Sequence, residues 1–144
     1  MNAFLKSKSM QHVSMWSFAI MFACTSAAAL AETMTVKLSG DHEVPPVKSS
    51  GSGSGSITIN DDGSVSGSVT ASGFTPTAAH IHEAAVGKNG PVIVPFEKEG
   101  DKFGPKAGAK LTPDQMKAFK EGNLYVNMHR TAHPGGEVRA QLKP

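Results

Sequence analysis

Alternating apolar and polar residues mark several short segments of the chain as strands. In 33–40 (TMTVKLSG), Met34, Val36 and Leu38 fall on one side, and 64–73 (SVSGSVTASG) alternates in the same way. Successive side chains of a strand point to opposite faces, so a period of two predicts half-buried β-strands. The pattern therefore favours a sheet that buries one face.

A turn signal connects two of these strands. The sequence DDG at 61–63 lies between 55–60 and 65–71, which predicts a β-hairpin. The Gly/Ser run at 51–56 is typical of a flexible linker, but it lies within the repeating strand pattern. We interpret it as the entry to a strand or a bulge.

The second half of the chain continues in short segments. Strands are predicted around the histidines of AAHIHE and at 91–97, 124–129 and 136–142, whereas 98–110 shows no periodicity and is predicted to be a loop. The sequence therefore predicts an all-β fold, a Greek-key β-sandwich or barrel.

One short helix is predicted near 112–121. Thr112 is a typical N-cap, Pro113 suits the first helical position, and Gln115 completes a capping box. Gly122 follows as the terminator.

Residues 1–31 have the features of a cleaved secretory signal. Lys6 and Lys8 precede an uncharged apolar run that ends in Ala-Leu-Ala at 29–31. We expect a single mature domain over 32–144, in the periplasm or secreted, without a membrane span.

Removal of that segment changes the charge and the available ligands. The two lysines leave with it, so 12 of the 14 basic residues remain against 12 acidic ones, and Cys24 is lost. A balanced charge gives no reason to expect a nucleic-acid partner. Any transition metal must be held by histidine or carboxylate.

Four histidines form two pairs near strand ends. His80 and His82 are two residues apart in a predicted strand, so they share a face, opposite Ile81. In 124–129 the apolar residues alternate with positions that include His129, and His133 follows shortly after. If the apolar residues face the core, the imidazoles lie on the outer face of the sheet.

Imidazoles without thiolates suit copper or zinc, so His80, His82, His129 and His133 are candidate ligands of one of these metals. Asn127 shares the face of His129 and is a candidate to orient a ligand. The alternative is two unrelated polar strand ends. His42, beside a Pro-Pro turn, is interpreted as a surface residue, with a fifth ligand as the alternative.

Glu137 and Arg139 share a face of the last predicted strand. Two interpretations are open. The residues pair with each other, or Arg139 borders the metal and attracts small anions.

Four segments resemble the CHRD domain, the module named after chordin that also occurs in secreted bacterial proteins. They are LSGDHEVPPV (38–47), AAHIHEAAVGKNGPV (78–92), LTPDQ (111–115) and NLYVNMHRTAHPGGEVRAQL (123–142). The resemblance covers nearly all of the expected mature chain and implies a β-fold more firmly than a function.

A weaker similarity links AHIHE, VNMH and GGEVRAQL to the copper-site segments of copper-zinc superoxide dismutases. It implies copper ligation by His80, His82 and His129, and it matches Arg139 to the arginine that guides superoxide. The cysteine pair and the evident zinc cluster of that family are missing, so a single copper site is implied.

The leading hypothesis is an exported domain that holds one copper ion for handling or storage. The alternatives are a copper-only, dismutase-like enzyme acting on superoxide and a metal-free protein-interaction module. The sequence gives no indication of oligomeric state.

Overall fold

A computed structural model describes residues 30–144, so most of the predicted signal segment lies outside the described residues. The elements, in chain order, are β1 (Ala31–Leu38), the 3₁₀ helix η1 (Gly40–His42), β2 (Ser52–Asn60), β3 (Val65–Ser72), β4 (Ala78–Glu83), β5 (Val92–Glu99), β6 (Lys102–Pro105), α1 (Pro113–Lys120), β7 (Leu124–Arg130) and β8 (His133–Leu142). The all-β fold with one short helix is confirmed.

The strands form one antiparallel sheet in the order β1-β2-β3-β6-β5-β4-β7-β8. β4, β5 and β6 follow one another through short connections, and the chain then returns to place β7 beside β4, which is a Greek-key connection. The outermost strands meet at one point, where Ser39 and Arg139 exchange two backbone hydrogen bonds of 3.2 and 3.0 Å. The sheet is therefore a nearly closed barrel.

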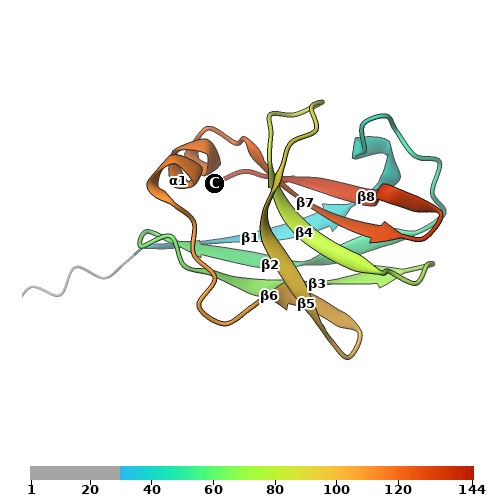
Figure 1. Ribbon diagram of the computed structural model, residues 1–144, viewed down its shortest axis with the longest axis horizontal. Helices are drawn as coiled ribbons and strands as arrows, with labels where there is room; N and C mark the ends of the chain where they lie inside the picture. The colour runs from blue at the N-terminus through green and yellow to red at the C-terminus, as the bar shows by residue number, and fades with distance from the viewer. Residues whose placement is uncertain (1–29) are drawn as a thin grey trace, which may run out of the picture.

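The sheet folds into two layers with the apolar core between them (Figure 1). The alternating apolar residues of the strands point inward, as the sequence pattern predicts. They include Val36, Leu38, Ile57, Ile59, Val65, Val69, Ile81, Leu124, Val126, Met128, Val138 and Leu142, all buried. Because the core uses one face of each strand, the intervening residues of β4, β7 and β8 lie outside the barrel.

The helix begins where its capping residues place it. The Thr112 hydroxyl accepts a hydrogen bond from the Gln115 backbone, and the Gln115 side chain accepts one from the Thr112 backbone, so the predicted capping box is confirmed. Phe119 turns inward to the barrel core. No helix within residues 30–144 is long and apolar enough to cross a membrane.

The prediction of a loop over 98–110 was wrong, because β6 lies within it. β6 has four residues and pairs with β3 on one side and with β5 on the other. Phe103 is its one deeply buried side chain, 2 % exposed. A strand with a single apolar side chain has no readable alternation, and it is held by the backbone hydrogen bonds of its neighbours.

We expect Phe103→Ala to lower the free energy of unfolding by about 3–5 kcal/mol, because it leaves a cavity between the sheet layers. Denaturant unfolding measures the loss. Lys102→Ala, on the same strand but exposed, is the control and should change stability by less than about 0.5 kcal/mol. Similar small effects for both variants would contradict a core position for Phe103.

Candidate metal centre

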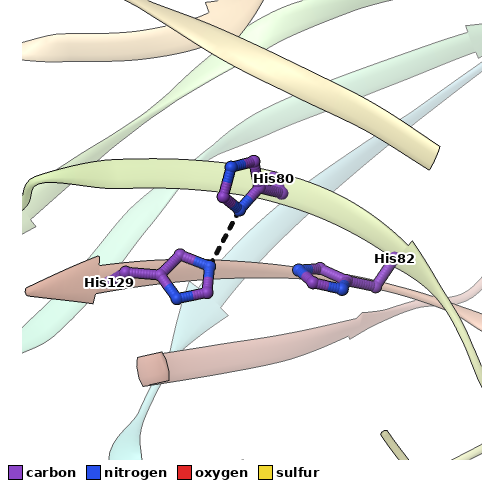
Figure 2. A group of neighbouring side chains, drawn as sticks. All are labelled: His80, His82 and His129. Atoms are coloured by element: carbon purple, nitrogen blue, oxygen red, sulfur yellow. Dashed lines mark hydrogen bonds between the residues drawn. The ribbon is translucent and has the colours of Figure 1, made fainter. Parts of the chain in front are cut away.

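Three of the four predicted metal ligands lie together on the outer face of the barrel. His80 and His82 extend from β4 and His129 extends from the neighbouring β7, and the three rings converge (Figure 2). In the β4–β7 ladder, His80 faces Asn127 and Ala78 faces His129, so His80 and His129 are diagonal neighbours. Strand parity and register thus place all three imidazoles on one face.

The three side chains are close enough to share an ion. Each offers one ring nitrogen such that all three atoms lie within 4.8 Å of one another. The ring centroids are 4.7 Å apart for His80 and His129, 5.6 Å for His80 and His82, and 6.0 Å for His82 and His129. The group contains imidazoles alone, which is a donor set for copper or zinc.

Backbone carbonyls fix the orientation of two rings. Nδ1–H of His82 donates to the Gly90 carbonyl at 3.0 Å, and Nδ1–H of His129 donates to the Pro134 carbonyl at 2.9 Å. A carbonyl accepts but never donates, so each Nδ1 keeps its proton and each Nε2 presents a lone pair. Histidines that bind metals usually donate the N–H of the other ring nitrogen to such an acceptor.

The third ring completes the arrangement. Nδ1 of His80 lies 2.9 Å from Nε2 of His129. Since Nε2 of His129 is an acceptor, His80 donates its Nδ1 proton in this contact. Ring nitrogens at this separation would also be close enough to hold one ion between them.

Although they lie outside the barrel, these histidines are not a solvated surface. His82 and His129 are each 8 % exposed and His80 is partly exposed. Burial, followed by the charges of His129 and His82, lowers the pKa of His80 to about 4. Burial also lowers the pKa of His82 and of His129, more than their carbonyl contacts raise it. The rings are therefore neutral, the form that binds metals, at neutral pH.

The loop of residues 84–91, between β4 and β5, covers this face. Gly90 brings the loop back over β4, where its carbonyl reaches His82. A Cβ on Gly90 would lie 2.7 Å from the backbone carbon of Glu83, so this close approach requires glycine. The amide of Asn89 also donates to the Val44 carbonyl at 2.7 Å, which ties the loop to the segment after η1.

A stack of three side chains supports the loop from below. The rings of His82 and Tyr125 are parallel to within 5° with centroids 4.8 Å apart, and the Arg139 guanidinium lies 3.4 Å from the Tyr125 ring. Because β7 lies between β4 and β8, His82 and Arg139 occupy opposite sides of Tyr125. Arg139 also donates to the Lys88 carbonyl at 2.7 Å and to the Asn89 side chain at 3.2 Å.

Of the two interpretations of Glu137 and Arg139, the one in which they pair with each other does not hold, because their side chains bind different partners. Glu137 accepts hydrogen bonds from Ser49 and His133 and lies 3.4 Å from Arg130. Burial raises the pKa of Glu137, but these partners outweigh it and hold the pKa below its usual value. Glu137 and Arg139 share a face of β8, but Glu137 contacts Ser49 and His133, whereas Arg139 contacts the loop at 84–91.

His133 and His42 lie apart from the three converging rings. The Nδ1 atom of His133 contacts the Glu137 carboxylate, and the group that the described chain brings together does not include it. His42 is exposed, as the sequence interpretation has it, and its Nδ1 lies 3.3 Å from the Arg139 carbonyl.

Glu43 is a functional candidate that sequence reasoning missed. It follows η1, is 5 % exposed, and packs its carboxyl against Gly136 at the start of β8. Burial raises its pKa to about 7, although the charge of Arg139 and the amide of Asn127 act to lower it. The available signal was an acidic residue directly before the apolar VPPV of GDHEVPPV; nothing local in that sequence indicates burial.

The model of the CHRD domain family matches residues 34–142. The chain belongs to the CHRD domain family. No curated protein and no solved structure matches it significantly. In this CHRD domain, the matched region contains every element from η1 to β8 and all residues of the histidine group.

We expect His82 and His129 of the metal-free protein to be Nδ1–H tautomers at pH 7, because each Nδ1 faces a carbonyl. Long-range ¹H–¹⁵N NMR distinguishes the two ring nitrogens and measures this directly. An Nε2–H tautomer at either buried ring would contradict the site geometry.

Glu43→Gln tests the raised pKa of Glu43. A carboxyl whose folded pKa is above its unfolded value favours the folded state at low pH, and this contribution is lost as the pH rises from 4.5 to about 7. Glutamine has no such loss. Relative to the wild type, the variant should gain roughly 2–3 kcal/mol between pH 4.5 and 8, as measured by denaturant unfolding.

The exposed Asp41→Asn is the matched control for this experiment. Glu43→Gln should gain stability relative to Asp41→Asn as the pH rises over the same range. Absence of such a relative gain would contradict a raised pKa at Glu43.

Proposed function

We propose that this CHRD domain binds one copper ion through His80, His82 and His129 and serves in copper handling or storage. The observation that carries the proposal is the buried Nε2 atom of His82, which finds no hydrogen-bond partner within residues 30–144. An unpaired buried polar atom costs free energy. A bound cation would satisfy it, together with the lone pairs of the neighbouring rings.

Copper suits the donor set better than other common metals. Three imidazoles without a thiolate favour copper or zinc over calcium, magnesium or iron–sulfur clusters. Between the two metals, the similarity of AHIHE, VNMH and GGEVRAQL to the copper-site segments of copper-zinc superoxide dismutases favours copper.

Binding has more support than dismutation. A dismutase-like role would use Arg139 to attract the superoxide anion. Its guanidinium is instead 1 % exposed and engaged by Tyr125, Lys88 and Asn89. The Arg139 guanidinium therefore fixes the loop and is not free to attract an anion. For this reason we propose copper handling or storage rather than dismutation.

We place this function in the periplasm or outside the cell. The support for export is the sequence of residues 1–31, with its basic start, apolar run and small residues at 29–31. An oxidising compartment favours Cu(II), which imidazole ligands bind well.

Titration of residues 32–144 with Cu(II) tests the proposal. We expect one tight site whose paramagnetic resonance spectrum has nitrogen couplings from imidazole. His80→Ala combined with His129→Ala should remove it, because a single imidazole remains. Absence of a tight site in the wild type, or unchanged binding by the double variant, would overturn the proposal.

Two single variants serve as controls on the ligand set. His133→Ala and His42→Ala should each bind one Cu(II) with wild-type affinity and spectrum, since both rings lie outside the group. Loss of binding in His133→Ala would instead make it a fourth ligand. Competition with Zn(II) in the same titration measures the preference between the metals.

A further inference from the structure

Three buried acceptor atoms without partners lie along a path from the histidine group to the loop after η1. They are Nε2 of His82, Oδ1 of Asn127 and Oε1 of Glu43, and none finds a hydrogen-bond partner within residues 30–144. Asn127 is close enough to His82 to raise its pKa and close enough to Glu43 to lower its pKa. The amide therefore lies between a candidate metal ligand and a buried acid.

Asn127 has a fixed backbone position for this role. In the sheet it pairs with His80 of β4 on one side and with Arg139 of β8 on the other. Its Nδ2 makes one long contact of 3.4 Å to the Gly135 carbonyl. At 1 % exposure the amide cannot turn to bulk water, so its remaining partners must come from Glu43 and the histidine group.

The carboxyl of Glu43 is held equally closely. A Cβ on Gly136 would lie 2.6 Å from Oε2, so the glycine makes the space that the carboxyl fills. Two acceptor oxygens, Oε1 of Glu43 and Oδ1 of Asn127, then remain unpaired in one dry region. A single proton on Glu43 resolves the deficit, because a protonated carboxyl donates one hydrogen bond.

We propose that Glu43 is a positioning residue of the metal centre, which acts by donating a hydrogen bond from its protonated, buried carboxyl to Oδ1 of Asn127. The donated hydrogen bond holds the Asn127 oxygen toward Glu43. When Glu43 loses that proton, its carboxylate accepts from Nδ2 instead, and the amide turns its oxygen toward His82. The orientation of Asn127 at His82 therefore follows the proton on Glu43.

The charges around Glu43 are compatible with a proton that exchanges near neutral pH. Burial raises the pKa of Glu43 to about 7, with the positive Arg139 and the negative Glu137 of β8 acting in opposite directions. Glu43 lines a cavity of about 740 Å³ together with Lys37 of β1 and with its sequence neighbours Asp41 and His42. It also lines a second cavity, to which His133 of β8 contributes. The proposal extends the proposed copper site, but its first test needs no metal.

The first test follows the side-chain amide of Asn127 by ¹H–¹⁵N NMR in the metal-free protein between pH 5 and 9. In the wild type this signal should shift with a midpoint near pH 7. In Glu43→Gln, whose amide donates to Oδ1 at every pH, the shift should disappear and the signal should match the wild type at low pH. Asp41→Asn should titrate as the wild type does.

The second test uses copper. The Cu(II) spectrum of the wild type should change with a midpoint below that of the metal-free protein, because the positive ion favours the carboxylate of Glu43, and that of Glu43→Gln should be constant across the range. Asn127→Ala should weaken copper binding by about 10-fold or more, as expected for a residue that orients a ligand, and should abolish the pH-dependent change.

An Asn127 signal without a step near pH 7 in the wild type, or with the same step in Glu43→Gln, would overturn the inference. If Glu43→Gln does not fold, the Glu43 carboxyl is titrated in the wild type by ¹³C NMR. The inference requires that its midpoint equal the midpoint of the Asn127 amide signal, and different midpoints would overturn it. A wild type that binds no copper at any pH refutes the proposed function, while the metal-free titration still decides the role of Glu43.

Discussion

The outer face of this barrel depends on one interaction, the hydrogen bonds from the buried guanidinium of Arg139 to the loop at 84–91. It donates to the backbone and side chain of the loop at 84–91 and lies against Tyr125, whose other side carries His82. A cation with several donors can hold a loop whose carbonyls would otherwise lose water without compensation. With the loop in place, the Gly90 carbonyl reaches His82, and an exposed strand face becomes a buried site.

This burial explains the chemistry of the site. Exposed imidazoles would be partly protonated near neutral pH and free to exchange tautomers, whereas the three rings here have lowered pKa values and two have carbonyl partners. Such a group could hold a cation without first losing protons or reorienting these two rings. The same dry environment raises the pKa of Glu43. Low polarity therefore keeps the histidines neutral and lets a nearby carboxyl retain its proton.

Part of this arrangement is readable in the sequence because it depends on local periodicity. Alternation placed Val36, Leu38 and Val126 in the core, and the same parity assigned His80, His82 and His129 to one outer face. The capping box of α1 is equally local, since its partners are three residues apart. β6 was missed because its pairing depends on β3 and β5, and one buried phenylalanine leaves no alternation to read.

By itself the sequence determined the strand faces, the helix and the choice of histidine as the candidate ligand, since these follow from side-chain spacing along one segment. Only the tertiary structure decided which histidines meet. Antiparallel register brought His129 beside His80, while Glu137 engaged His133 elsewhere. The burial of Glu43 and Arg139 was likewise a tertiary outcome. It depends on loops distant in sequence packing over β7 and β8, and no period within one segment encodes that contact.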